Sequence, residues 1–378
     1  MSITAPTRLN LPPTEACSSA AHSPATTSCS ISDRHHGPNG RSTLTYRPLV
    51  SSRLTAGVLG RTLDSIPPAV GADVMATGII SIALSLDGQE ALSRVMLAIA
   101  AAIWVTLAML LPLRAARDPA GFRADARTPA AFTAAVATAV LGTRLTLLGW
   151  TWAGCAMLVV AVALWAALLR PVLDGWQSPT MGVSLLLAVS VESLAVLVAS
   201  VAAPEHAHWL LIAALVPFGL GLGLYGFVIS RFDLHQLAVG RGDHWMAGGA
   251  LGIAALAAAK IADGARALGI AGLRGHALED IAICLWVLTM VWLLVLLLAE
   301  ARWPRLSIGP ARWSTVFPLG MYAASSLAVG VAAQAEAITS FARVWVWIAL
   351  GLWMIVFVAA VGRAVEVVRG ERPAGYAS

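Results

Sequence analysis

The sequence is poor in charged residues. Asp, Glu, Lys and Arg make up 12% of its 378 residues, and Lys260 is the only lysine. An ordinary soluble domain carries about 25% charged residues, because water must solvate its surface. With 58% hydrophobic residues, this chain has too little polar surface for that, whereas a bilayer accepts apolar side chains. The composition therefore predicts a protein that is solvated by lipid.

The sequence also lacks the spacing patterns of metal, cofactor and enzyme sites. Its four cysteines show no CxxC spacing and have no neighbouring histidines, so they predict neither a zinc site nor a disulfide framework. Glycine-rich phosphate loops, HExxH and GxSxG are missing as well. The formal net charge of +5 comes from basic residues dispersed between apolar runs, unlike the clusters of nucleic-acid-binding proteins. We expect no metal, no cofactor, no nucleic-acid partner and no enzyme activity.

Three regions follow from the distribution of polar residues. Residues 1–66 are rich in Ser, Thr, Pro and Arg and show no apolar periodicity, which is typical of disorder. They also contain no apolar stretch of the kind found in a signal peptide. We expect a disordered cytoplasmic tail over residues 1–66, a transmembrane domain over residues 67–365 and a short cytoplasmic C-terminal tail over residues 366–378.

From residue 67 onward, apolar stretches alternate with short polar connections. Each stretch has the roughly 20 residues that a helix needs to cross a hydrocarbon core at about 1.5 Å per residue. Ten spans are expected, over residues 68–86, 92–113, 129–149, 152–170, 181–201, 207–230, 244–263, 279–299, 313–333 and 343–364.

The arginines predict the orientation of these spans, because cytoplasmic loops accumulate Lys and Arg. When the N-terminus is placed inside, most arginines fall on the inside ends and loops, including Arg114, Arg117, Arg123 and Arg127 between the second and third spans. We therefore expect a multi-pass protein of the inner (plasma) membrane with both termini in the cytoplasm.

The expected spans differ in character according to their order along the chain. Bulky amphipathic rings favour a lipid-facing or interfacial surface. The tryptophans that lie within spans belong to even-numbered ones: Trp104, Trp152, Trp165, Trp209, Trp286, Trp292, Trp345, Trp347 and Trp353. Odd-numbered spans instead collect glycines and the ionisable residues Asp73, Arg144, Glu192 and Lys260, which normally face a partner or a water-filled cavity. This predicts an all-α fold of five helical hairpins around a central pore, with odd helices inside and even helices outside.

Three stretches carry a resemblance to a known family. Residues 67–83 read PPAVGADVMATGIISIA, residues 242–251 read GDHWMAGGAL, and residues 313–322 read WSTVFPLGMY. In order and spacing they resemble the tellurite-resistance/dicarboxylate transporter family, a branch of the voltage-dependent anion channel superfamily that includes plant slow anion channels. The resemblance covers about residues 65–365. It implies ten helices in five hairpins, a pore inside each protomer and a homotrimer.

The resemblance assigns a gate to Phe317. In that family a phenylalanine on the ninth helix plugs the pore, and the FPLG stretch places Phe317 at the matching position. Pro318 removes a backbone donor and loosens the helix beside the ring, and Gly320 leaves room for a passage. The alternative is that Phe317 is an ordinary core or lipid-facing side chain.

Thr77, Gly78 and Ser81 are candidate pore-lining residues in the first span. They would offer hydroxyl groups and open backbone to a passing anion. The alternative is that the hydroxyl groups bond to their own helix, as Ser and Thr often do. Asp73 departs from the apolar residue expected beside the MATG stretch in this family, so the family's first-helix contacts do not transfer strictly.

Three ionisable residues each have two interpretations. Arg144 and Lys260 are expected to attract anions near the outer mouth of the pore, and Glu192 is the candidate group for proton coupling. Alternatively, Glu192 forms a structural ion pair with Lys260 or Arg144, or Lys260 extends to the interface.

These observations predict a protein that passes a small anion across a membrane: a C4-dicarboxylate, sulfite, a tellurite-related oxyanion, chloride or nitrate. The mechanism is either a pore gated by an aromatic residue or a proton-coupled dicarboxylate carrier. Two further alternatives are a membrane-embedded enzyme, which requires clustered acids, bases or metal ligands, and a sensor that uses the N-terminal tail. The only expected partners are the lipid bilayer, the anion and further copies of the chain.

Overall fold

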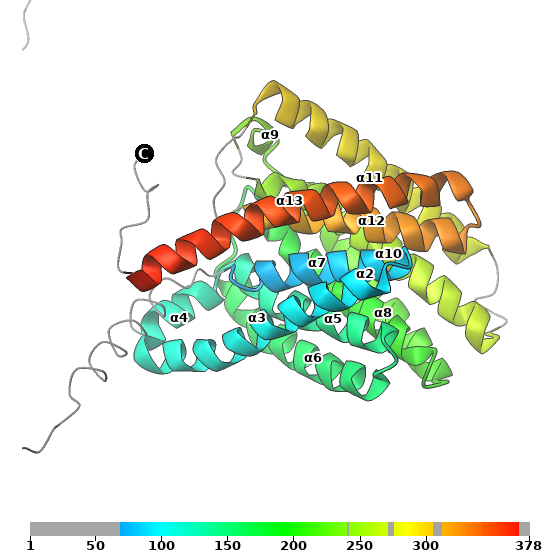
Figure 1. The fold of residues 1–378 in the computed structure, drawn as a ribbon, viewed down its shortest axis with the longest axis horizontal. Helices are drawn as coiled ribbons and strands as arrows, with labels where there is room; N and C mark the ends of the chain where they lie inside the picture. The colour runs from blue at the N-terminus through cyan, green and yellow to red at the C-terminus, as the bar shows by residue number, and fades with distance from the viewer. Residues whose placement is uncertain (1–68, 240–241, 271–275, 305–311, 370–378) are drawn as a thin grey trace, which may run out of the picture. The chain divides into compact units, whose positions relative to one another are not determined.

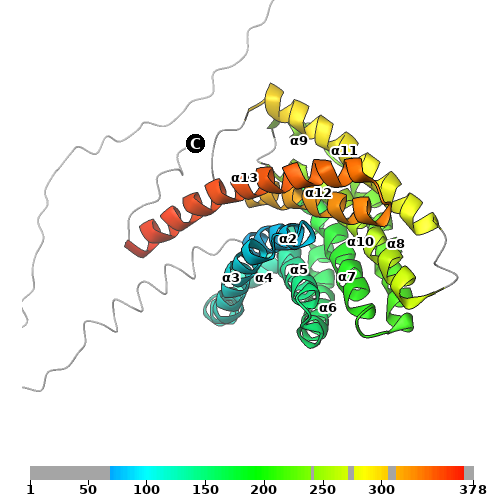
Figure 2. The same ribbon diagram turned by 45° about the vertical axis from the view of Figure 1, so that its right-hand side comes forward.

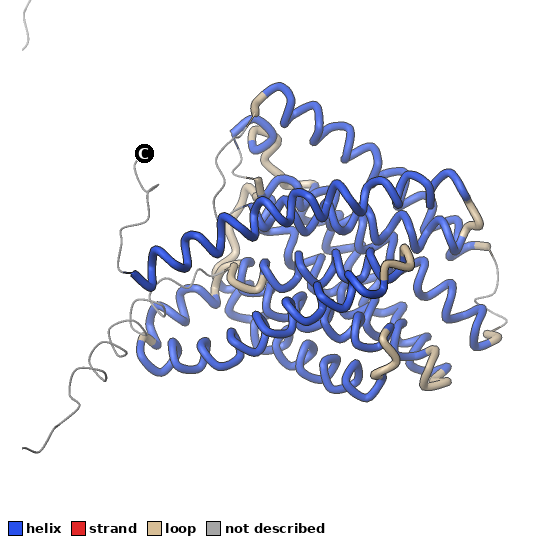
Figure 3. The backbone as a smooth tube through the Cα atoms, in the orientation of Figure 1, coloured by secondary structure: helices blue, strands red, loops and turns tan. Residues whose placement is uncertain are grey.

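The computed structural model describes residues 69–239, 242–270, 276–304 and 312–369. The chain divides into residues 1–49 and 50–378, and all of the described residues belong to the second unit. The predicted tail over residues 1–66 and residues 370–378 lie outside the described residues. Over the described ranges the regular structure is helical and contains no strand, as Figures 1 and 3 show.

Nine of the described helices are long and apolar enough to cross a membrane, which confirms an all-helical membrane protein. Three of them begin with a 3-10 turn: η1 (Pro129–Phe132), η2 (Gly182–Leu185) and η3 (Asp243–Trp245). The nine helices are α3 (Glu90–Arg117), α5 (Thr133–Leu147), α6 (Thr151–Asp174), α7 (Leu186–Ala202), α8 (His208–Ile229), α10 (Met246–Leu268), α11 (Ala277–Arg302), α12 (Trp313–Ala332) and α13 (Glu336–Arg369).

The expected first span corresponds to α2 (Ala72–Leu86), which is shorter than predicted. Its 15 residues rise about 23 Å, against a hydrocarbon core of about 30 Å. Two prolines precede it, and Gly71 presses against the backbone of Thr133, so the helix begins later than the apolar stretch does. Two very short helices, α4 (Pro119–Ala126) and α9 (Gln236–Val239), lie in connections.

Burial alternates along the chain. In the apolar windows of the spans containing α5, α7, α10 and α12, 78% to 94% of residues are buried, whereas in α3, α6, α8, α11 and α13 the share is 17% to 28%. Helix α2 is buried over almost its whole length. A helix that is apolar all round and buried belongs to a core. The helices expected to lie inside are therefore the buried ones, and those rich in tryptophan expose most of their surface.

The buried helices contact one another in a closed order. Helix α2 packs against α5, α5 against α7, α7 against α10, α10 against α12, and α12 returns to α2. We call these five helices the inner ring. Each also packs against the exposed helix that follows it in sequence. Figure 2 shows the exposed helices lying outside the members of the ring.

Three exposed helices are attached to the inner ring by tryptophan hydrogen bonds. In each case an indole N–H donates to a hydroxyl group on a ring helix over 2.8 to 3.0 Å. A buried indole needs such a partner. The pairs are Trp104 with Thr138, Trp286 with Ser326, and Trp353 with Thr77.

Candidate functional site

A small cavity lies among four helices of the inner ring. Its volume is about 10 Å³, which is room for about one water molecule. Its lining is mostly aliphatic, with one threonine and one serine. Helices α2, α5, α7 and α10 supply Ile79 and Ile82, Val140 and Thr143, Ser193 and Val196, and Ile253 and Leu256 respectively.

These lining residues share one spacing. Each of the four helices contributes two residues three positions apart, which places both on one face, a turn from each other. The two hydroxyl groups are bonded within their own helices, Thr143 to the carbonyl of Ala139 over 2.9 Å and Ser193 to that of Ser190 over 2.8 Å. The wall is therefore close to neutral and apolar. None of these eight residues is among the sequence-predicted pore residues, which were glycines, a proline, hydroxyl residues and charged residues. Apolar pairs three positions apart recur throughout these buried helices, so the spacing alone does not single them out.

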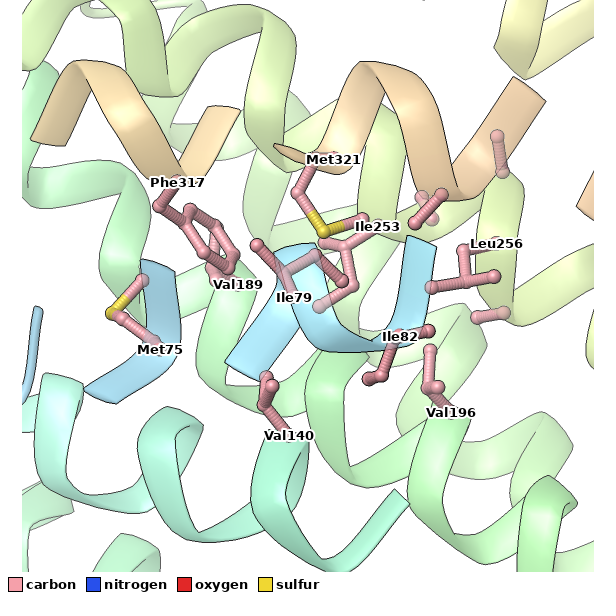
Figure 4. Packing of buried hydrophobic residues seen from close by; sticks show 14 of the residues in the cluster. Met75, Ile79, Ile82, Val140, Val189, Val196, Ile253, Leu256, Phe317 and Met321 are labelled. Carbon is pink, nitrogen blue, oxygen red and sulfur yellow. The ribbon is translucent and has the colours of Figure 1, made fainter. Parts of the chain in front are cut away.

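Phe317 is fully buried on α12, and Gly320, three residues later, packs against the cavity residue Ile79. Figure 4 shows its ring extending from α12 towards Val189 on α7, one turn before Ser193. Helices α7 and α12 are not neighbours in the inner ring, so a side chain that extends from one towards the other enters the interior of the ring. The adjacent Pro318 is buried too, and its ring packs closely on Gly249 of α10.

Gly78 and Gly320 bring neighbouring ring helices together. A Cβ atom at position 78 would lie 2.7 Å from Cγ1 of Val140, and one at position 320 would lie 2.5 Å from Cγ2 of Ile79. Both separations are shorter than any ordinary contact of a Cβ atom, so a larger residue at either position would push the two helices apart. Val140 and Ile79 line the cavity, so the two glycines determine how closely these lining residues approach. Val140 covers Gly78 and Ile79 covers Gly320, so neither glycine lines the cavity itself.

Thr77 and Ser81 point towards outer helices. The hydroxyl group of Thr77 accepts the indole N–H of Trp353 on α13. The hydroxyl group of Ser81 donates to the carbonyl of Ser93 on α3 over 2.7 Å, and the hydroxyl group of Ser93 donates in return to the carbonyl of Ser81 over 2.6 Å. The hydroxyl group of Thr77 also donates to the carbonyl of Asp73 in its own helix over 2.7 Å, as the alternative from the sequence foresaw. Both hydroxyl groups thus take part in joining helices.

Arg144 belongs to a polar cluster between α2, α3 and α5. Its side chain is fully buried, its Nε donates to Ser93 over 2.8 Å, and its Nη2 donates to both carboxylate oxygens of Glu90 over 2.8 Å. Glu90 also accepts from the exposed Arg94 over 3.0 Å. Nη1 of Arg144 has no hydrogen-bond partner within the described ranges. The cation is therefore held mainly by Glu90.

Lys260 lies at the other end of the cavity from Phe317. It follows Leu256 by four residues on α10, so it continues the face that lines the cavity by one further turn. The residue is half-buried, and Asp263, three positions later, is the charged group that interacts with it. Its place fits a cation near the mouth of a pathway.

Glu192 is buried with both carboxyl oxygens lacking a hydrogen-bond partner among the described residues. The ion pair with Lys260 or Arg144 that the sequence left open is therefore not formed. The carboxyl group lies against Gly221 of α8, where any larger residue would collide with it. Its neighbour Ser193 faces the cavity, so Glu192 points to the contact between α7 and α8.

The described ranges contain no group of three or more His, Cys, Asp or Glu residues that could hold a metal ion. Fold and site together define a multi-pass helical membrane protein with a small, mostly apolar cavity inside a ring of helices. The chain belongs to the voltage-dependent anion channel family, whose profile matches residues 65–361. Its members are channels and transporters rather than enzymes, and the family supports anion transport across a membrane.

Two curated relatives are uncharacterized membrane proteins of Mycobacterium tuberculosis, one from strain CDC 1551 / Oshkosh and one from strain H37Rv. Each is 34% identical over 125 residues, which is 31% of this chain and 61% of the relative. The chain thus spans about three-fifths of the length of these relatives. Their similarity supports a membrane protein and names no substrate.

Proposed function

We propose that the chain conducts a small anion along the axis of the inner ring and that Phe317 closes this path. In this proposal α2 completes ten spans arranged as five hairpins, within residues 67–365. The observation that carries the proposal is the cavity lined by four ring helices together with the buried ring of Phe317, which extends from α12 into the interior of the inner ring towards Val189. Such a ring blocks a narrow path because an anion must displace it or lose its water.

The electrostatics of the ring favour anions. Successive ring helices are separated by one outer helix each, so all five run in the same direction and their N-terminal ends lie on the side of Phe317. Helix N-termini carry a partial positive charge and C-termini a partial negative one. The full positive charge of Lys260 lies near the C-terminal ends and opposes their negative charge. Between these ends the lining is apolar, so the free-energy cost of removing water from each anion determines the order in which anions permeate. For passive flow we expect nitrate to pass more readily than chloride, and chloride more readily than sulfite, a tellurite-related oxyanion or a C4-dicarboxylate.

The arginine distribution supports an inner-membrane protein with both termini in the cytoplasm. The family resemblance supports a homotrimer in which each protomer contains its own path. The tails at residues 1–66 and 366–378 are not needed for the path in this proposal, since every residue assigned to it lies between Ile79 and Phe317.

The path is tested by cysteine substitution in the Phe317→Ala background. Thr143→Cys and Ser193→Cys replace the two hydroxyl residues of the cavity with thiols of similar size. We expect a charged, water-soluble thiol reagent to modify both and to reduce anion flux into liposomes by at least about tenfold, because the adduct fills a path little wider than one water molecule.

The matched control is Thr77→Cys, a threonine at similar depth that faces α13. The same reagent is expected to leave flux through this variant unchanged. If the reagent blocks anion flux through Thr77→Cys and has no effect on Thr143→Cys and Ser193→Cys, the path lies outside the inner ring and the proposal is wrong.

A proton-coupled dicarboxylate carrier is the second candidate function. The observation in its favour is the buried carboxyl group of Glu192, which has no hydrogen-bond partner in the part of the chain that the structure describes. A carrier requires a group that binds and releases a proton, whereas a passive path does not. Since Glu192 faces α8 and not the cavity, we expect Glu192→Gln, which keeps the shape of the side chain, to leave anion flux within about twofold of the wild type, a difference under about 0.5 kcal/mol. Uptake of malate that depends on a pH gradient and disappears in Glu192→Gln would favour the carrier instead.

A further inference from the structure

A second cavity lies outside the inner ring, between α3 and α6. Its volume is about 600 Å³, within the roughly 300 to 1,000 Å³ of pockets that hold small molecules. Helices α2 and α5 form its floor, α3 and α6 its walls, and α4 lies at one end. In Figure 2 the ribbons of α3 and α6 diverge on either side of α5. We call this space the α3–α6 cleft.

The α3–α6 cleft is apolar along its length and polar at one end. Its long walls carry side chains such as Leu107, Leu111 and Leu164, whereas Arg114 and Asp125 form an ion pair at the α4 end. On α3 the lining extends from Trp104 to Arg114, which is about 15 Å at 1.5 Å per residue. That is about half of a 30 Å hydrocarbon core, the depth of one lipid leaflet.

Arginines are frequent in the segments that form the polar end of the cleft. Besides Arg114, four exposed arginines lie within three residues of a lining residue, against three aspartates in the same segments. These segments therefore carry net positive charge. We call the four exposed residues the rim arginines: Arg117, Arg123, Arg127 and Arg170.

We propose that the α3–α6 cleft binds one acyl chain of an anionic phospholipid whose headgroup lies among the rim arginines. The cleft opens between helices that expose their surfaces where lipid tails surround the protein. Its length matches one leaflet, and its charged end follows the apolar lining of α3, where a lipid headgroup would lie when the acyl chain occupies the cleft. Anionic lipids gain about 1 kcal/mol, or about fivefold in binding, from each arginine near the headgroup. An aliphatic chain matches the leucine walls.

The test measures lipid retained by the purified full-length chain. The protein is reconstituted in equimolar phosphatidylglycerol and phosphatidylcholine, extracted in mild detergent and analysed for bound lipid by mass spectrometry. We expect phosphatidylglycerol to be retained in excess. Ala108→Phe and Ala167→Phe place a ring inside the cleft and are expected to reduce the retained lipid about fivefold or more, as loss of a fitted chain requires. Ala102→Phe, on the exposed surface of α3 outside the cleft, is the matched control and is expected to retain it.

The headgroup contact is tested separately. Arg117→Gln combined with Arg123→Gln is expected to lower the ratio of phosphatidylglycerol to phosphatidylcholine about fivefold per arginine, whereas Arg94→Gln at the far end of α3 leaves it unchanged. Each variant is first shown to be monodisperse and to melt like the wild type.

Three results would overturn the proposal. The first is equal retention of both lipids by wild type and cleft variants. The second is that Ala108→Phe or Ala167→Phe disrupts an oligomer without changing the amount of retained lipid, which would show that a second copy of the chain occupies the cleft. The third is a wild-type protein that retains no phosphatidylglycerol in excess and does so only after deletion of residues 1–66, which would assign the cleft in the intact chain to its own N-terminal tail.

Discussion

Phe317→Ala is expected to raise anion flux through the protein by about tenfold or more, which corresponds to lowering the barrier by at least about 1.4 kcal/mol. The fully buried ring extends into the interior of the inner ring, and we expect its removal to open a space that joins the cavity lined by Ile79 and Ser193. The measurement is anion current across planar bilayers, or anion influx into liposomes, at equal protein density.

Two controls separate a gate from a core residue. Removing a buried phenylalanine costs about 3 to 5 kcal/mol of stability, so the variant must first be shown to be folded and monodisperse. Phe132→Ala removes another fully buried phenylalanine, at the start of α5 and outside the cavity lining, and is expected to destabilise the protein without raising flux. Equal flux through wild type and a folded Phe317→Ala protein would show that the ring does not close the path.

Glu90→Gln is expected to lower the free energy of unfolding by about 3 kcal/mol, because it leaves the buried guanidinium of Arg144 without its carboxylate. Arg144→Met is expected to lower the free energy of unfolding by less than Glu90→Gln does. The remaining Glu90 carboxylate is partly exposed and still pairs with Arg94, while methionine replaces a buried charge with an apolar chain. Denaturant or thermal unfolding in one detergent measures both changes.

The exposed ion pair provides the matched control. Arg94→Met removes the partner of Glu90 that faces outward, and exposed pairs contribute about 0 to 1 kcal/mol. The double variant Glu90→Gln/Arg144→Met is expected to recover part of the loss, because no uncompensated cation remains. If Arg144→Met instead lowers anion flux and leaves stability unchanged, Arg144 attracts anions at the pore mouth and its structural role is secondary.

The distribution of residue types was sufficient to predict membrane insertion and the order of buried and exposed helices. Low charge excludes a soluble surface, and glycine-rich and tryptophan-rich stretches alternate along the chain. Most span boundaries agree within a few residues, as in the expected span 313–333 and the observed α12. The span predicted over residues 68–86 is longer than the observed α2. Hydropathy does not depend on the helix-breaking prolines before α2 or on the close approach of Gly71 to Thr133.

The direction in which each ring residue faces could not be predicted. Helix α2 is buried on every side, so its apolar pattern is uniform and marks no single face. Thr77 and Ser81 were expected to line a pore, yet their hydroxyl groups bond to Trp353 and Ser93 on outer helices. Ile79, between them in sequence, lines the cavity.

The sequence by itself determined that this chain enters a bilayer and which helices are shielded from lipid, because both depend on the transfer of side chains out of water, which is a sum over residue types. Only the tertiary structure decided that Arg144 pairs with Glu90, that Glu192 has no hydrogen-bond partner among the described residues, and which residues enclose the central cavity. Those outcomes depend on the rotation of each helix about its axis, and that rotation is determined by packing against neighbours that are distant in sequence.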